Sequence, residues 1–91
     1  MAVTIHLPAL LARHAAGARA LIVEGGTVAE ALSAAGRAHP ELGRRLEEAT
    51  KPEAPFVTIY VNDEDVRFLS GFDTAVKDGD EVSVVSAIAG G

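Results

Sequence analysis

One amphipathic segment in the first half of the chain limits the folds that this sequence can adopt. Thr27 is a residue type that caps helices, and Glu30 follows it at the spacing of a capping box. Apolar residues then recur on one helical stripe, at Val28, Ala31, Leu32 and Ala35. Pro40 disfavours helical backbone at His39, so the helix is expected to end near that residue. The pattern predicts one main helix whose apolar stripe packs on a second layer.

Segments with strand character lie on both sides of this helix. Strands are expected at residues 3–7, 20–23, 56–61 and 82–85. Residues 3–7 alternate apolar and polar with period two, and residues 56–61 are β-branched and aromatic. A short pairing strand is expected at 64–68, after a tight turn at Asn62-Asp63, and Asp78-Gly79 marks another turn. Leu42 and Leu46 predict one further short helical turn, and residues 47–55 a loop. The order predicts an α+β fold, a mixed sheet of four to five strands with one main helix packed across it.

Length and charge limit the class of protein further. The chain has 91 residues, enough for one domain, which we place at 1–86 with a flexible tail at 87–91. The net charge of −5 repels nucleic acid and anionic membranes and favours a partner with a basic surface. There is no cysteine, which excludes a disulfide scaffold and a thiol nucleophile. No signal peptide or transmembrane segment is evident, so a cytoplasmic protein is expected.

No motif in the sequence predicts catalysis or metal binding by a side chain. The acidic residues gather in two groups, Asp63, Glu64 and Asp65, and Asp78, Asp80 and Glu81. Neither group has the spacing of a calcium loop, and Asp commonly starts turns, so solvated turns are the preferred interpretation. His6, His14 and His39 do not have the spacing of metal ligands. We therefore expect no catalytic residue, no metal site and no permanently bound cofactor.

A small apolar cluster, Phe68, Leu69 and Phe72, follows the short strand. It could fill a satellite core beneath its own loop, or it could form an exposed patch on which a partner docks. The sequence alone supports both interpretations equally.

The last five residues have a composition that suits insertion into a narrow channel of another protein. Residues 87–91, Ala87, Ile88, Ala89, Gly90 and Gly91, would span roughly 17 Å when extended. Glycine has no Cβ, so the backbone can pass through a narrow channel. An α-carboxylate is anionic at neutral pH and must be activated before it reacts, for instance as a mixed anhydride with AMP. The tail is therefore expected to enter a partner's active site and to act as a substrate.

Three segments resemble a known family. They are residues 59–68 (IYVNDEDVRF), 78–82 (DGDEV) and 87–91 (AIAGG). These segments, with the strand and helix order, resemble the β-grasp, ubiquitin-like sulfur carriers of the MoaD, ThiS and CysO type, and residues 61–67 are most similar to the CysO branch. The resemblance implies that Gly91 is adenylated and converted to a terminal thiocarboxylate, which then donates sulfur to a biosynthetic enzyme.

The resemblance also implies a set of partners. ATP would be used by an adenylating enzyme of the MoeB, ThiF or MoeZ type, and sulfur would come from a rhodanese-like or persulfide donor. The acceptor in the CysO branch is a pyridoxal-phosphate-dependent cysteine synthase, with a JAMM-type metalloprotease to free the product. Related carriers serve molybdopterin, thiamin or thiosugar synthesis. Two other functions stay open: a protein modifier conjugated through Gly91, and a β-grasp interaction module that is not conjugated.

Overall fold

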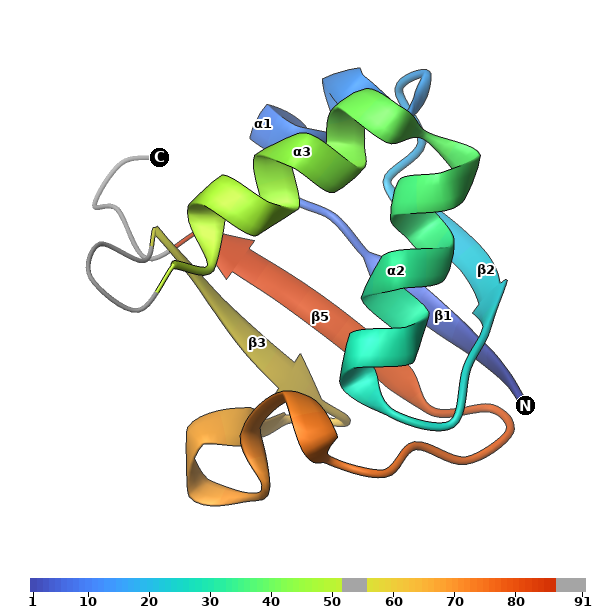
Figure 1. Cartoon of the computed structure of the whole chain (residues 1–91), viewed down its shortest axis with the longest axis vertical. Helices are drawn as coiled ribbons and strands as arrows, with labels where there is room; N and C mark the ends of the chain where they lie inside the picture. Colours follow the sequence, from blue (N-terminus) through green and yellow to red (C-terminus); the bar gives the residue numbers. More distant parts are fainter. Residues whose placement is uncertain (52–55, 87–91) are drawn as a thin grey trace.

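The computed structural model describes residues 1–51 and 56–86, and it contains a five-stranded mixed sheet (Figure 1). The strands are β1 (Ala2–His6), β2 (Ala20–Glu24), β3 (Val57–Val61), β4 (Glu64–Asp65) and β5 (Glu81–Ser86). Their order across the sheet is β2-β1-β5-β3-β4. β1 and β5 are parallel, and the other neighbouring pairs are antiparallel. The expected α+β class and mixed sheet are confirmed.

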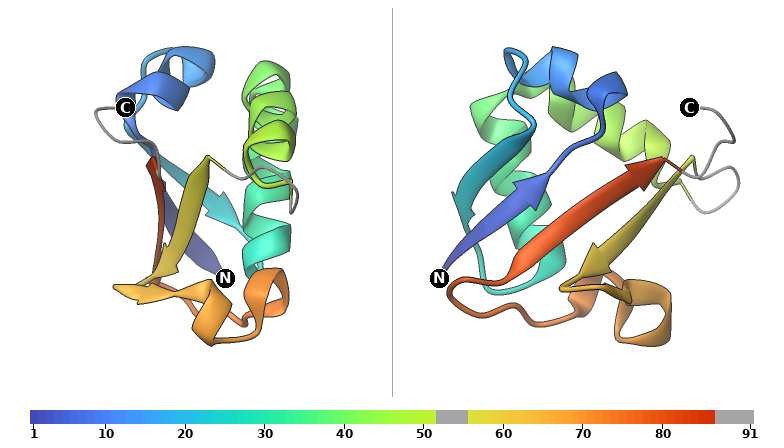
Figure 2. Two further views of the ribbon diagram at one scale, coloured as in Figure 1. Left: turned by 90° about the vertical axis from the view of Figure 1, so that its left-hand side faces the viewer. Right: turned by 180° about the vertical axis from the view of Figure 1, so that it is seen from behind.

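Helices cover one face of this sheet (Figure 2). The α-helices are α1 (Ala9–Ala12), α2 (Val28–Ala38) and α3 (Pro40–Ala49). Three 3₁₀ turns connect the other elements, η1 (Arg13–Ala15), η2 (Val66–Phe68) and η3 (Gly71–Asp73). The fold is thus two layers, with α2 and α3 on one side of the sheet. No helix in the described residues is long and apolar enough to cross a membrane.

The start and end of α2 follow the sequence pattern. Thr27 Oγ1 accepts a hydrogen bond from the backbone N–H of Glu30 at 3.1 Å. The carboxylate of Glu30 accepts from the N–H of Gly26 at 2.7 Å, one residue before the position that a standard capping box uses. The helix ends at Ala38, directly before His39 and Pro40, as predicted.

The expectation of one main helix and a loop from residue 47 is wrong in one respect, because α3 is a ten-residue helix. Pro40 is its first residue, a position where the missing N–H and the fixed φ favour helix rather than break it. Leu42, Leu46 and Ala49 are buried on one stripe of α3. Burial of this stripe continues the helix through Glu47 and Glu48, which are exposed.

The two long helices can lie against each other because glycines stand where they meet. A Cβ on Gly43 would lie 2.8 Å from the Cα of Gly36, closer than real Cβ contacts. Any side chain at either position would push the helices apart. This contact is not visible in the hydrophobic pattern, which is one reason why a short turn was expected.

The core lies between the sheet and the helices. Its largest fully buried side chains are Ile5, Leu42, Val3, Val28 and Val82. Ala31 and Ala35 of the predicted stripe are also fully buried, whereas Leu32 is only half-buried and packs at the margin. The predicted place of Leu32 in the core is therefore corrected, and Leu42 of α3 is the leucine that fills the centre.

The strand expected at 64–68 is also shorter than predicted. Asn62 and Asp63 form the expected tight turn, with φ of 53° and 98°. β4 then ends at Asp65, because the carboxylate of Asp65 accepts the backbone N–H of Arg67 at 2.8 Å and starts η2. Local side-chain capping thus replaces strand pairing after two residues.

Candidate functional site

The strand that leads to the end of the sequence lies in the middle of the sheet. β5 pairs with β1 on one side and with β3 on the other, and its last described residue, Ser86, lies opposite Val57. The proposed tail, Ala87, Ile88, Ala89, Gly90 and Gly91, lies outside the described residues. Its role, and the domain boundary at residue 86, therefore stay predictions.

The surroundings of Ser86 belong to two other elements. Val57 begins β3, and the N–H of Phe56 donates to the carbonyl of Ala49 at the end of α3, at 2.9 Å. Figure 2 shows the end of β5, the start of β3 and the end of α3 at the same corner of the molecule. Phe56 is 40% exposed there. The chain therefore leaves the sheet at a corner that is fixed by three packed elements.

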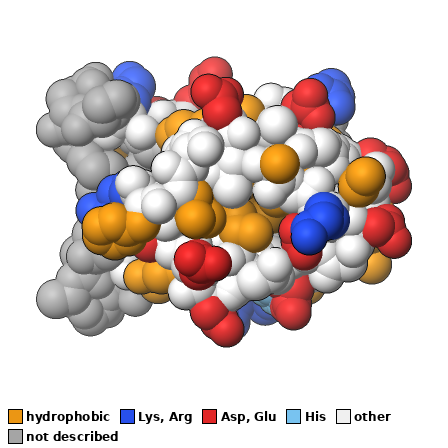
Figure 3. Space-filling model, turned by 90° about the horizontal axis from the view of Figure 1, so that it is seen from below, with side chains coloured by type: hydrophobic (Ala, Val, Ile, Leu, Met, Phe, Trp, Pro, Cys, Tyr) orange, Lys and Arg blue, Asp and Glu red, His pale blue; other side chains and the backbone are white. Residues whose placement is uncertain are grey.

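The apolar cluster Phe68, Leu69 and Phe72, here called the η2–η3 patch, is on the surface. The three side chains are 84%, 41% and 40% exposed. Exposed hydrophobic side chains stand among acidic ones on the face of the molecule seen from below (Figure 3). Of the two interpretations left open by the sequence, the exposed patch is the one observed.

Hydrogen bonds hold the backbone beneath the patch. Thr74 is the one buried polar residue of the described chain, and its hydroxyl donates to the carbonyl of Gly71 at 2.6 Å. The same hydroxyl accepts the N–H of Ser70 at 3.0 Å. The carbonyl of Thr74 accepts the N–H of Val28, the first residue of α2, also at 3.0 Å. The patch is thus tied to α2 by backbone rather than by burial of its own aromatic rings.

An ion pair fixes the other end of the same loop. The Arg67 guanidinium donates to both carboxylate oxygens of Asp65, with the shortest distance 2.7 Å. These hydrogen bonds, together with the one from the backbone N–H of Arg67, hold the pKa of Asp65 below its ordinary value. Asp65 therefore stays ionised at neutral pH and keeps η2 in place.

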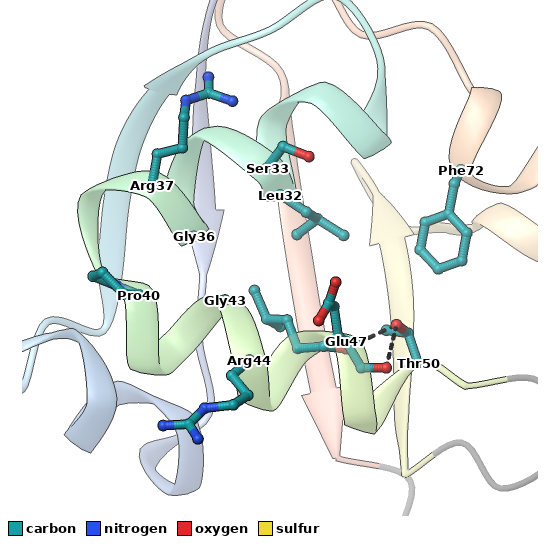
Figure 4. Close-up of a pocket in the computed structure, with 11 residues that line it drawn as sticks. Leu32, Ser33, Gly36, Arg37, Pro40, Gly43, Arg44, Glu47, Thr50 and Phe72 are labelled. Carbon is teal, nitrogen blue, oxygen red and sulfur yellow. Dashed lines mark hydrogen bonds between the residues drawn. The ribbon is translucent and has the colours of Figure 1, made fainter.

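A groove between α2 and α3 continues from the patch. It has a volume of about 680 Å³, and its lining includes Leu32, Gly36, Gly43, Leu46 and Phe72. Figure 4 shows Leu32 and Phe72 beside the groove, with Arg37 and Arg44 pointing away from it in opposite directions. Because Phe72 belongs to both, the patch and the groove form one continuous surface, and Ser33, Glu47 and Thr50 add polar groups to the groove. The groove was not predicted from the sequence, in which the glycines at positions 36 and 43 are its only signal.

The acidic groups are turn-forming residues, as predicted. Asp80 accepts the backbone N–H of Lys77 at 2.8 Å and an amide N–H of Asn62 at 3.1 Å, and both bonds hold its pKa below the ordinary value. Asp78 accepts the N–H of Ala2 at 2.9 Å. Glu81 instead pairs with His6 across neighbouring strands, at 2.6 Å. These carboxylates hold turns and strand ends together.

The histidines do not meet in space. No group of three potential metal ligands occurs within residues 1–51 and 56–86. His6 lies on β1, His14 in η1 and His39 between α2 and α3. The site that the described chain offers is therefore a surface, formed by the η2–η3 patch, the groove and the corner at Ser86.

Comparison with known proteins identifies the family of the chain that carries this surface. The sequence model of the ThiS family matches residues 5–91. The sulfur carrier protein CysO of Mycobacterium tuberculosis is 39% identical over 93 aligned residues, covering 100% of both chains.

Solved structures agree with the sequence match. CysO in the BexX/CysO complex of Amycolatopsis orientalis superposes with a TM-score of 0.85 at 37% identity, over 98% of this chain and 99% of that one. Small archaeal modifier protein 1 of Methanosarcina acetivorans has a TM-score of 0.81 at 26% identity, over 99% and 96%. The β-grasp fold and the resemblance to the CysO branch are confirmed, and the chain belongs to the ThiS family.

Proposed function

We propose that this protein carries sulfur as a thiocarboxylate on Gly91 and delivers it to a biosynthetic enzyme. The observation that carries the proposal is the 39% identity with CysO over the full length of both chains. The family match also extends through Gly91. A sulfur carrier role is shared by relatives of this family, whereas the identity of Gly91 as the attachment residue is our inference.

The chemistry follows from the carboxylate of Gly91. The carboxylate attacks the α-phosphorus of ATP, pyrophosphate leaves, and an acyl-adenylate forms. Hydrosulfide then attacks the acyl carbon, AMP leaves, and a thiocarboxylate remains. With a persulfide donor, the attack gives an acyl disulfide, and a second thiol of the donor cleaves its S–S bond, forming a disulfide on the donor and releasing the thiocarboxylate. The thiocarboxylate sulfur is the nucleophile in the next reaction, so the carrier changes a poorly reactive carboxylate into a sulfur donor.

The protein would be a substrate in these steps and not an enzyme. Its reacting group would be its own carboxylate, whereas Asp78, Asp80 and Glu41 serve a strand end, a turn and a helix surface. Adenylation would be catalysed by an enzyme of the MoeB, ThiF or MoeZ type, which brings the ATP. A rhodanese-like or persulfide donor would supply sulfur, and the cycle would run in the cytoplasm.

The η2–η3 patch is our candidate for docking on a partner. Phe68 is 84% exposed on a loop that Thr74 and Asp65 fix by hydrogen bonds. An apolar side chain held in place before binding loses little entropy when it is buried by a partner. Residues Ala87 to Gly90 would thread into the active site while this patch stays on the enzyme's surface.

Docking through the patch has a direct test. Phe68→Ser should lower kcat/KM for adenylation about 10-fold or more, because exposed aromatic residues often dominate interfaces. Leu10→Ser is the matched control, since Leu10 is also exposed but lies on α1. Equal effects of the two variants, or none for Phe68→Ser, would remove the patch from the docking surface.

The sulfur acceptor is proposed by chemistry and by one structural relative. CysO of Amycolatopsis orientalis has been crystallised in complex with BexX, so a CysO protein binds a second protein. For this chain we propose an acceptor synthase, either a pyridoxal-phosphate-dependent cysteine synthase or an enzyme that thiolates a cofactor or sugar. A JAMM-type metalloprotease would be needed only where the product stays joined to Gly91.

A second candidate function is protein modification through Gly91. The similarity to small archaeal modifier protein 1, at a TM-score of 0.81, favours it. A modifier forms an isopeptide bond between Gly91 and a lysine, whereas a carrier is released with its sulfur consumed. The two functions share the adenylation step and differ in the product.

One experiment separates these functions. The protein is incubated with an adenylating enzyme of the ThiF type, ATP and hydrosulfide, and its intact mass is measured. A carrier should show one terminal oxygen replaced by sulfur, and omission of ATP should abolish the change. Lysine-linked adducts in a cell extract, without any thiocarboxylate, would favour the modifier. If neither product forms, the interaction module is the function that remains.

A further inference from the structure

We propose that two copies of this chain associate through the outer edge of β2, as an antiparallel strand pair with Ile22 on the two-fold axis. The surface concerned lies on the opposite side of β1 from β5, so this inference does not rest on the sulfur carrier role. It rests on the hydrogen-bonding direction of β2, on its exposure and on the match of its sequence with itself.

Every second residue of β2 directs its backbone N–H and C=O groups away from β1. β2 ends the sheet, and its partner β1 pairs on one side only. Leu7 N–H donates to the carbonyl of Arg19 at 2.8 Å, and Gly25 N–H donates to that of Met1 at 3.0 Å. In an antiparallel ladder, residues at alternate positions direct their backbone groups to opposite sides. The groups that point away from β1 therefore belong to Ala20, Ile22 and Glu24.

β2 lacks the features that keep edge strands from pairing. Residues 20–24, Ala-Leu-Ile-Val-Glu, contain no proline and no lysine, and their pairing with β1 is regular, without a bulge. Ile22 is 79% exposed. The opposite edge differs, because β4 has two residues and continues into η2. Of the two edges of the described sheet, only β2 is long, apolar and open.

The sequence of β2 complements itself when two copies run in opposite directions. With Ile22 opposite Ile22, Ala20 falls opposite Glu24, and the outward backbone groups of these three residues meet those of the second copy. Leu21 falls opposite Val23, so their side chains are neighbours across the pair although their backbone groups face β1. Glu24 ends the strand and pairs with the N-terminal ammonium of its own chain at 2.9 Å, so antiparallel pairing keeps the two Glu24 carboxylates at opposite ends of the interface. Parallel pairing would place Glu24 beside Glu24, which is unfavourable.

Pairing would also cover side chains that are now only partly packed. Leu21 and Val23 are partly buried against the core from within their own chain. Apolar pairs of this kind, opposite each other on neighbouring strands, stabilise a sheet. β1 separates β5 from the new interface, so the corner at Ser86 stays accessible in both copies.

The position of Ile22 on the axis gives a sharp test. Ile22→Lys and Ile22→Glu each place like charges against each other, so each variant alone should be monomeric, whereas an equimolar mixture should associate. The reference is the wild-type chain in sedimentation velocity, at concentrations from about 10 μM to about 1 mM, because one strand pair is smaller than a standard interface of about 1,600 Å². Wild type should approach twice the monomer mass at the highest concentration.

Matched variants on the same open face separate edge pairing from other association. Val85 is 45% exposed but lies on the central strand β5. Val85→Lys, Val85→Glu and their mixture should each associate as wild type does. The proposal is overturned if wild type keeps the monomer mass at 1 mM, if the Ile22 mixture is no heavier than its components, or if the Val85 variants alone abolish association. Thermal unfolding by circular dichroism confirms that all variants are folded.

Discussion

The helix-covered core and the η2–η3 loop both contain leucine, valine or phenylalanine, but they use them in opposite ways. In the core, Leu42 is completely buried between α3 and the sheet. In the loop, Phe68 is 84% exposed, and the backbone is held instead by Thr74 and Asp65. Stability is thus concentrated in one region, and the apolar side chains of the other contribute little to it. Side chains that folding does not need are available for a partner.

The difference between the packed core and the exposed loop also bears on Gly91, the proposed reactive residue, which follows the central strand β5. β5 is the central strand, flanked by β1 and β3, and its valines Val82 and Val84 are buried. The chain therefore reaches residue 86 from the most firmly packed part of the fold. Changes beyond residue 86 should alter the chemistry without altering the stability of the domain.

The largest expected difference in stability is between leucine-to-alanine substitutions in the two regions. Leu42→Ala removes a fully buried side chain and should lower the free energy of unfolding by about 2–5 kcal/mol. Leu69→Ala, at a residue that is 41% exposed, should cost less than about 1 kcal/mol. Urea titrations of both variants measure the difference. Costs of similar size would mean that the loop is part of the core and would break the comparison.

The contact between α2 and α3 should give the next largest effect. Gly43→Ala would gain helix propensity of about 1 kcal/mol on an exposed helix, yet its Cβ would meet the Cα of Gly36 at 2.8 Å. Backbone must move, so we expect a net loss of about 1–3 kcal/mol in urea titration.

Gly26→Ala is the control for this prediction, because its Cβ would meet only the carboxylate of Glu30, at the end of a flexible side chain. It should change stability by no more than about 0.5 kcal/mol. A stabilised Gly43→Ala protein would show that the helices do not need the glycine contact.

The smallest effect concerns the turn that precedes β5. The backbone N–H of Lys77 and the amide of Asn62 hold the pKa of Asp80 below its ordinary value of 3.8. The folded state therefore favours the carboxylate, and its contribution is fully present above about pH 4 and is lost as the pH falls through the folded-state pKa. Asp80→Asn should flatten the decrease of the unfolding midpoint between about pH 5 and pH 2.

Asp73→Asn provides the reference for that pH series. The carboxylate of Asp73 makes no hydrogen bond or ion pair within the described part of the chain. Its replacement removes one carboxylate, as Asp80→Asn does, but leaves both Asp80 hydrogen bonds in place. If the unfolding midpoint depends on pH in the same way for Asp80→Asn and wild type, the Asp80 hydrogen bonds do not contribute to stability.

Much of the fold could be predicted from local patterns. Thr27, Glu30 and Pro40 mark the limits of α2, and Asn62-Asp63 marks a turn that requires positive φ. What could not be predicted depends on contacts between distant segments. α3 continues to Ala49 because its apolar stripe is buried and because Gly43 meets Gly36. The spacing of Leu42 and Leu46 indicates a helical turn, but the contact between Gly43 and Gly36 that lets α3 lie against α2 has no local signature.

The candidate site was predictable to a different extent. The residues of the η2–η3 patch were identified from the sequence, but their exposure was not, because the network around Thr74 that supports the loop is formed by backbone and hydroxyl groups. The groove beside Phe72 follows from helix packing and was missed. Leu32 was predicted to be a core residue because helical periodicity shows which side of the helix faces the sheet but not how deeply each side chain is buried.

Sulfur attachment at Gly91 is tested by comparing the wild-type chain with one variant that lacks Gly91 and one in which Gly91 is replaced by alanine. Each is incubated with an adenylating enzyme of the ThiF type, ATP and hydrosulfide, and each is analysed by intact mass spectrometry and thermal unfolding. Wild type should gain one sulfur in place of oxygen, deletion of Gly91 should abolish this, and Gly91→Ala should react about 100-fold more slowly because a Cβ misplaces the acyl carbon. All three should unfold at the same temperature. Sulfur uptake by the protein without Gly91 would contradict the account.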